Sequence, residues 1–241
     1  MKRGQVTQFI IAGLIILIAV IFIILARLDY VKDLFEQQKA KFAGVPFDIK
    51  PVEEYVQSCL NEVAPLSKSA VLIQGGYYEP NNYIEIDIAN VALWYDKGKD
   101  VSPSLKFIES EIGKVVDVLI NSCIKEFYME GYGLSINNIN TNVKISENNI
   151  LMQSFVDVDV NYKDLNFSIK KKFNDKQDSD LYSIYGAGRA IIDLEVRNPD
   201  SIELTTLSKF GYDINFFRYN EDEMVYTIKT KNTNLFIGSK F

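Results

Sequence analysis

The chain contains no histidine, so it lacks the side chain that most often serves as general base, proton shuttle or zinc ligand near neutral pH. Ser-His-Asp triads and Cys-His pairs are therefore excluded. Mechanisms that use carboxylates, lysine, or serine with lysine remain open, and the candidate carboxylates are Glu85, Asp87, Asp157 and Asp159. We expect a protein that is not an enzyme, with no cofactor and no metal site.

Charged residues are absent from Phe9 to Ala26, a run of 18 residues. Counted from Val6, an α-helix over this run is about 30 Å long, which matches the hydrocarbon core of a bilayer. No good small-x-small cleavage motif follows the run, so we expect it to stay attached to the mature protein. The apolar side chains expected to meet lipid or other copies of the helix are Phe9, Ile10, Ile11, Leu14, Ile15, Leu17, Ile18, Ile21, Phe22 and Leu25.

The charges on the two sides of the apolar run differ. Lys2 and Arg3 precede the run, whereas Arg27 is soon offset by Asp29, so the positive-inside rule keeps the amino terminus in the cytoplasm and sends the rest outside. Beyond residue 26 the chain carries all 32 acidic residues but only 24 of the 26 basic ones, a net charge of −8. Such a charge disfavours phosphate backbones, so we expect no nucleic-acid partner.

Cysteine is nearly absent: the chain has only Cys59 and Cys123, both in the part expected to face outside, where thiols oxidise. A bridge between them would close a loop of about 65 residues and contribute roughly 4 kcal/mol in the chain-entropy model. Two buried, unpaired thiols are the alternative, because the sequence does not show the geometry of the pair. Both interpretations remain open at this stage.

The remaining pattern predicts an α+β fold in which an antiparallel sheet packs against helices, preceded by a long transmembrane or pilin-like helix. Leu28, Val31 and Leu34 continue a helical stripe that ends near Gly44. We therefore expect an N-terminal helix over residues 1–27, an amphipathic extension over 28–45 and an extracytoplasmic domain over 46–241, with candidate sublobes 46–175 and 176–241.

Three segments of the domain have helical periodicity. "PVEEYVQSCLNEVAPL" predicts a short helix over residues 51–66, and residues 102–131 predict a longer one capped by Ser102 and ending near Gly131. Similar nine-residue stretches, "YVQSCLNEV" and "LINSCIKEF", place each cysteine on the apolar side of its helix. Residues 179–211 predict a third helix that breaks at Asn198-Pro199.

Other segments alternate apolar and polar residues, as strands do. Residues 70–96 predict two strands, residues 140–173 an antiparallel meander, and residues 212–241 three short strands that include the chain end. Met152, Val156, Val158, Val160 and Tyr162 are expected on the inner face of the meander. Asp157 and Asp159 then point outward, where a solvated face is favoured over a calcium site because calcium needs more oxygen ligands.

Two glycine pairs and one glycosylation motif are the remaining local signals. Gly75-Gly76 lacks the spacing of a nucleotide loop and predicts a tight turn or bulge. Gly186 and Gly188 lie within a helical pattern, which predicts close helix packing. Asn166-Phe167-Ser168 is a candidate N-glycosylation site in a domain outside the cell.

The amino terminus "KRGQVTQFIIAGLIILIA" resembles the class III signals of archaeal type IV pilin-like proteins. The resemblance implies that a prepilin-type peptidase cuts between Gly4 and Gln5 and leaves the apolar helix in place. Thr7 and Phe9 stand where that family commonly has serine and glutamate.

A wider resemblance covers most of the chain to about residue 200. The motifs "PVEEYVQSCLNEV", "IQGGYY", "WYDKGK", "PSLKFIESEI" and "SCIKEF", in this order, are similar to uncharacterised membrane-anchored surface proteins of small-genome archaea. That family implies a location and a shared fold, and it has no assigned activity to transfer to any residue.

The sequence therefore favours a non-enzymatic cell-surface structural protein, held by its N-terminal helix in lipid or in the core of a filament. We expect a homo-oligomer whose outer domain contacts other copies or other surface proteins, either as a single-pass membrane protein or within an extracellular filament. The alternatives are a monomeric anchored receptor domain and an ectoenzyme that uses the four carboxylates named above.

Overall fold

The computed structural model describes residues 48–163, 165–198 and 211–241. Residues 50–241 form one compact unit, in which the described residues contain three helices and nine strands. This composition confirms the α+β class. The expected helices over residues 1–27 and 28–45 lie outside the described residues. Among the described helices, none is both long enough and apolar enough to cross a bilayer.

Helix α2 spans Lys50–Ile73 and is longer than the sequence predicted. It continues through Pro65, so the expectation of extended structure from Ala70 onward is wrong for the first four residues. A proline inside a helix costs about 3 kcal/mol. Val71 and Leu72 lie beyond it and are fully buried, and burying each contributes about 1.5 to 3 kcal/mol, so core packing outweighs the proline.

Helix α3 spans Leu105–Lys125 and begins two residues later than expected. Its N-cap is Ser104, whose hydroxyl oxygen accepts from the Phe107 N–H at 3.2 Å, so the prediction of Ser102 as the cap is wrong. The Ser102 hydroxyl instead donates to the carboxylate of Asp100, which precedes the helix. The C-terminal end lies at residue 125 instead of near Gly131.

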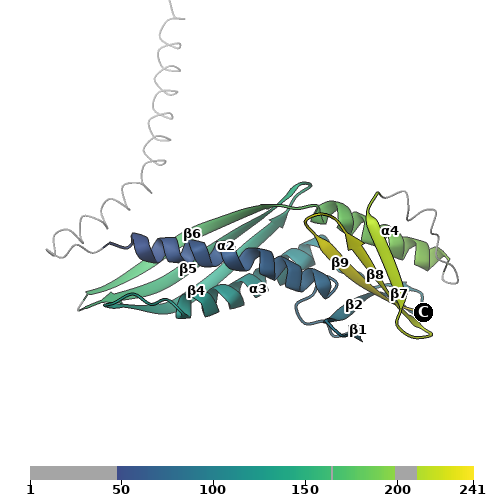
Figure 1. Ribbon diagram of the computed structural model, residues 1–241, viewed down its shortest axis with the longest axis horizontal. Helices are drawn as coiled ribbons and strands as arrows, with labels where there is room; N and C mark the ends of the chain where they lie inside the picture. Colours follow the sequence, from purple (N-terminus) through teal and green to yellow (C-terminus); the bar gives the residue numbers. More distant parts are fainter. Residues whose placement is uncertain (1–47, 164, 199–210) are drawn as a thin grey trace, which may run out of the picture. The chain divides into compact units, whose positions relative to one another are not determined.

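The predicted meander is confirmed as an antiparallel sheet in the order β4-β5-β6. Its strands, Tyr132–Ile145, Asn149–Tyr162 and Leu165–Asp178, each have 14 residues. Helices α2 and α3 lie over one face of this sheet (Figure 1). The predicted inner residues are buried on that face, apart from Tyr162, which is half-buried at the strand end: Met152, Val156, Val158 and Val160.

A second, larger sheet has the order β1-β2-β9-β8-β7, with β3 paired to β2. Its strands are β1 Tyr83–Ile86, β2 Ala89–Asp96, β3 Lys99–Asp100, β7 Asp213–Arg218, β8 Glu223–Lys229 and β9 Asn234–Lys240. Strands β2 and β9 run parallel, so this sheet is mixed, whereas the sequence predicted an antiparallel sheet. Parallel neighbours need a crossover, and most of the domain lies between these two strands.

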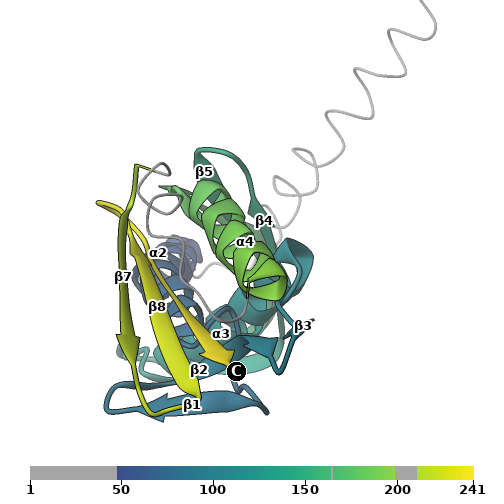
Figure 2. The ribbon, with the colours of Figure 1, turned by 90° about the vertical axis from the view of Figure 1, so that its right-hand side faces the viewer.

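Helix α4 spans Leu181–Arg197 and confirms the third predicted helix up to its break at Asn198. It packs against the larger sheet, beside β8 and β9 (Figure 2). Its apolar stripe is buried, and the Trp94 ring of β2 lies 5.7 Å from the Tyr185 ring. The brief resumption of helix expected up to residue 211 lies outside the described residues.

The boundary proposed at residue 175 does not separate two sheets. Strand β6 spans it, and β9 from the C-terminal side pairs with β2 from the N-terminal side. Helix α2 also contacts elements of both sheets. Its Glu53 lies 2.6 Å from Lys171 of β6, and its Lys68 donates to the carbonyl of Asn232, beside β9, at 3.4 Å.

Candidate functional site

The two cysteines form a disulfide that joins α2 to α3. The Cys59 and Cys123 sulfur atoms are 2.01 Å apart, and their Cα atoms are separated by 5.8 Å. The bridged alternative is therefore confirmed, at the point where the two similar nine-residue stretches meet. Tyr55 reinforces this junction, since its hydroxyl donates to the Cys123 carbonyl oxygen at 2.9 Å. The sulfur atoms have a structural role.

The four carboxylates considered for catalysis do not come together. Asp157 and Asp159 lie on the outer face of β5, while Glu85 is on β1 and Asp87 follows it, in the other sheet. Asp157 lies 3.0 Å from Lys170, and this contact holds its pKa below the usual value. No group of three or more acidic, cysteine or histidine side chains within the described ranges is placed to hold a metal ion.

The most distinctive polar arrangement runs along the edge of β4. The Ile145 N–H donates to Glu109 Oε1 of α3 at 2.8 Å, and the Thr141 N–H and hydroxyl lie near the Asp117 carboxylate. Between them, Gly113 lets the helix approach closely, because a Cβ there would lie 2.7 Å from the Thr141 carbonyl oxygen. Helix α3 therefore covers edge N–H groups that β4 would otherwise expose.

The α3 residues that meet the edge of β4, Glu109, Gly113 and Asp117, recur every four residues. The next positions at this interval are Asn121 and Lys125. Here a groove of about 560 Å³ opens between the helix and the strand. Its walls are Asp117, Val118, Asn121, Ile124 and Lys125 of α3, and residues 134–139 of β4. This volume lies within the usual range of ligand sites.

A β-bulge lies in the strand that forms one wall of the groove. The pairing of β4 with β5 shifts register between Ile136 and Asn138, which leaves Asn137 as the extra residue. The Asn137 amide donates to Asp157 Oδ1 at 3.2 Å. Bulges bend a strand and re-aim its side chains, and they are frequent beside functional sites.

Two acceptors in this groove have no donor. Asp117 Oδ1 and Asn121 Oδ1 are buried, and neither has a hydrogen-bond partner among the described residues. A buried acceptor without a donor costs about 1 to 3 kcal/mol. Burial also raises the pKa of the Asp117 carboxyl above its ordinary value, and the hydrogen bonds from Thr141 offset only part of this effect.

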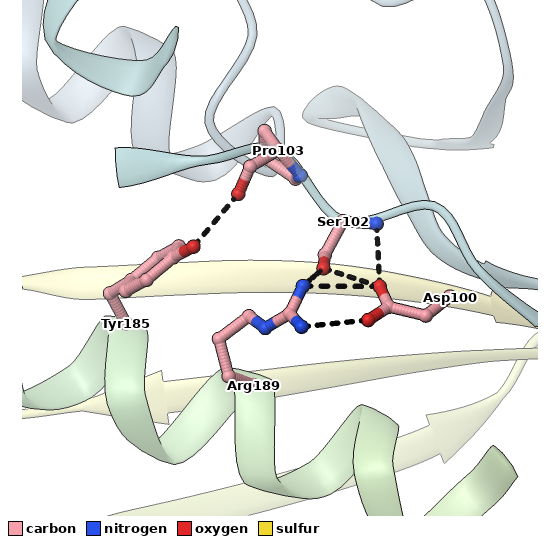
Figure 3. A network of polar contacts seen from close by, with 5 residues as sticks. All are labelled: Asp100, Ser102, Pro103, Tyr185 and Arg189. Atoms are coloured by element: carbon pink, nitrogen blue, oxygen red, sulfur yellow. Dashed lines mark hydrogen bonds and ion pairs between the residues drawn. The ribbon is translucent and has the colours of Figure 1, made fainter. Parts of the chain in front are cut away.

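A second polar network braces the segment before α3 against α4 (Figure 3). Arg189 Nη2 lies 2.8 Å from Asp100 Oδ2, and Arg189 Nη1 donates to Asp100 Oδ1 and to the Ser102 hydroxyl oxygen. The Tyr185 hydroxyl donates to the Pro103 carbonyl oxygen at 3.1 Å. Burial alone would raise the pKa of Asp100, but Ser102 and Arg189 hold it below its usual value. These polar groups satisfy one another, which indicates a structural brace.

A third cluster lies inside the domain, between α4 and the larger sheet. Glu195 is only 4% exposed, and its two oxygens accept from the Tyr226 hydroxyl at 2.5 Å and the Ser239 hydroxyl at 2.6 Å. Burial raises the pKa of the Glu195 carboxyl, although both hydroxyl contacts oppose the shift. The cluster satisfies a buried carboxylate and does not line the groove.

The glycine predictions have separate outcomes. Gly75 and Gly76 form the predicted turn, with φ angles of +72° and +88°, and their N–H groups donate to carbonyls in the last turn of α2. Gly188 packs closely against Ile237 and Trp94, as predicted, whereas a Cβ at Gly186 would meet nothing within 4 Å. The glycines of α4 therefore differ in role.

The glycosylation prediction stays a prediction. Asn166 is exposed on β6, so an acceptor there is accessible. The processing site at Gly4 and Gln5, and the ten apolar side chains of the expected N-terminal helix, lie outside the described residues.

The groove residues Asp117, Asn121 and Asn137 were not predicted from the sequence. One signal for the first two is present: Glu109, Gly113, Asp117, Asn121 and Lys125 follow each other at intervals of four in a helix whose other buried residues, apart from Glu111, are apolar. No comparable signal marks the bulge. No protein-family model matches this chain, and no curated protein and no solved structure matches it either.

Proposed function

We propose that the chain is a non-catalytic cell-surface protein, anchored or polymerised through its N-terminal apolar helix, whose outer domain makes protein–protein contacts. The observation that carries this proposal is the Cys59–Cys123 disulfide. Disulfides persist in oxidising compartments, which agrees with a domain held outside the cytoplasm. The positive residues before the apolar run support the same orientation.

The three-stranded sheet supports a role in protein contacts. Its outer face carries lysine, asparagine and serine side chains, exposed on both flanking strands. Within the described part of the chain, the strand order leaves one side of β4 and one side of β6 without a paired strand. Open edges recruit strands of other chains unless they are covered.

The location is tested by labelling an introduced thiol in intact cells. Tyr128 is 91% exposed, so a Tyr128→Cys variant presents a reactive thiol at the domain surface. We expect a membrane-impermeant maleimide to label this variant before the cells are opened. The matched control is the parent chain, which we expect to remain unlabelled because its cysteines are bridged. Labelling of the variant only after lysis would contradict the proposed orientation.

A monomeric anchored receptor is the second candidate, and the groove beside α3 favours it because a ligand site needs no polymer. Electron microscopy of cell-surface material, with the chain identified by antibody, separates the two. Filaments or tubes that contain the chain support the structural role. A detergent-extracted monomer with no such filaments supports the receptor. Mass measurement of the native chain shows whether the bond between Gly4 and Gln5 is cleaved, because cleavage removes four residues.

A further inference from the structure

We propose that the groove between α3 and β4 binds an extended peptide segment of a partner protein, which adds a strand to β4 and carries a basic residue followed four positions later by an acidic one. This inference deepens the proposed role in protein contacts and rests on it for the source of the peptide. Two features of the groove support it: a strand edge and a charged residue at each end.

The strand edge supplies the backbone half of the site. Backbone groups of a strand point alternately to its two sides, and Thr141 and Ile145 direct theirs to α3. Ile139 lies two residues before Thr141, so its N–H and C=O also point toward α3. Ile139 lines the groove. Residues 134–139 extend over about 20 Å, enough for a peptide of five or six residues to pair. The described strands leave this edge unpaired.

Helix α3 supplies the other wall. In peptide sites of this kind an added strand lies between a sheet edge and a neighbouring element, and its side chains enter pockets on alternate positions. Asp117 and Asn121 line this wall. Val118, which is 48% exposed, offers an apolar contact between them and the open side.

The charges at the two ends of the groove define the peptide. Asp117 is an anion at one end and favours a lysine or arginine, while Lys125 is an exposed cation at the other and favours an acidic side chain. Eight helical residues span about 12 Å. Four residues of an extended strand span about 13 Å, and residues four apart point to the same face. The spacing therefore selects a basic and an acidic residue at positions i and i+4.

The direction of the peptide follows from the direction of β4. Helix α3 runs antiparallel to β4, because Glu109 at its start meets Ile145 and Asp117 further on meets Thr141. Antiparallel pairing is the more stable per residue, so the added strand runs parallel to α3. Its first charged residue then lies at Asp117 and its second at Lys125, which places the basic residue before the acidic one.

The experiment uses the purified full-length protein and a fluorescent nonapeptide of alternating threonine and valine, with lysine at its third position and glutamate at its seventh. Fluorescence anisotropy measures binding. We expect saturable binding, and at least tenfold weaker binding of a control peptide in which lysine and glutamate exchange places. A second control peptide with proline at its centre lacks a backbone donor, and we expect it to bind more weakly.

Protein variants identify the groove as the site. Asp117→Asn removes the charge but keeps the shape, and we expect binding to weaken by about tenfold to a hundredfold. Val118→Arg changes a half-exposed side chain and blocks the groove, so we expect no binding. The matched control is Asp193→Asn, an exposed position of α4 outside the groove, which should bind like the parent. Thermal unfolding shows that each variant is folded.

Absence of binding to the folded parent overturns the inference, and so does binding that neither groove variant weakens. Equal binding of the exchanged peptide overturns the charge register. Dimerisation of the parent that Val118→Arg abolishes, without peptide binding, assigns the groove to a second copy and overturns the partner peptide. Failure of the thiol labelling with intact peptide binding rejects the proposed location alone, whereas surface labelling without peptide binding rejects this inference alone.

Discussion

At the scale of single residues, the absence of a side chain decides how closely α4 approaches the larger sheet. A Cβ built on Gly188 would lie 2.7 Å from Ile237 Cδ1, shorter than real Cβ contacts, and 3.0 Å from Trp94 Cζ3, at the tight limit of such contacts. Gly186, two residues earlier on the same helix, faces open space. The two glycines therefore give opposite expectations for the same substitution.

We expect Gly188→Ala to lower the free energy of unfolding by about 1 to 3 kcal/mol, because the added methyl group overpacks the contact between α4 and the sheet. Gly186→Ala is the matched control and should raise stability by about 0.5 to 1 kcal/mol, since alanine favours a helix interior. Chemical denaturation of both variants measures the difference. Equal effects of the two substitutions would contradict the packing described here.

Predictions for single residues were correct where the local sequence pattern fitted only one structure. The turn at Gly75 and Gly76 is of this kind, because no phosphate-loop spacing surrounds it. The N-cap of α3 is not: Ser102 was predicted as the cap, but it contacts its near neighbour Asp100 and Arg189, which is distant along the chain, and Ser104 caps the helix instead.

At the scale of elements, α2 and α3 are the helices that the disulfide joins. Each buries an apolar stripe against the three-stranded sheet, and the bridge closes a loop with a sequence separation of 64 residues. A cross-link of this length reduces the entropy of the unfolded chain, so its main effect is on stability. The Tyr55–Phe127 ring contact at 4.9 Å packs beside it.

We expect the double variant Cys59→Ala, Cys123→Ala to be less stable than the oxidised parent by about 2 to 5 kcal/mol. The parent treated with reductant should unfold near the midpoint of the double variant, and reductant should leave the variant unchanged. Denaturant titrations with and without reductant measure this. A parent whose midpoint does not respond to reductant would show that the bridge contributes nothing to stability.

Element lengths were the least predictable feature at this scale. Residues 140–173 predicted three antiparallel strands correctly, yet β4 begins eight residues earlier than the pattern indicated. The bulge at Asn137 explains part of this, because the extra residue interrupts the two-residue alternation that identifies strands. Helix α2 likewise runs past Pro65, since buried residues on both sides of the proline keep the backbone helical.

At the scale of the whole domain, α2 joins the two sheets. Its first turns contact β6 through Glu53 and Lys171, and its later turns place Lys68 beside the β8–β9 connection. Lys68 is only 6% exposed, and burial lowers its pKa. An element shared by both sheets couples their unfolding.

We expect the domain to unfold in one cooperative transition. Trp94 is the only tryptophan of the chain and lies in the larger sheet, so its fluorescence reports that sheet, whereas far-ultraviolet circular dichroism reports all helices and strands. The two midpoints should coincide in a denaturant titration of the full-length protein in detergent. A fluorescence transition that precedes or follows the dichroism would show that the sheets unfold separately.

The sequence by itself determined the features that depend on neighbours along the chain: the α+β class, the three helices, the meander and the inward side of its central strand. These follow from local periodicity, because a helix or strand repeats its buried side every few residues. The orientation of β9 beside β2, the disulfide and the groove beside α3 were decided only by the tertiary structure. Each depends on residues distant along the chain that meet in space, such as Asp117 with Thr141, and periodicity carries no information about which distant elements become neighbours.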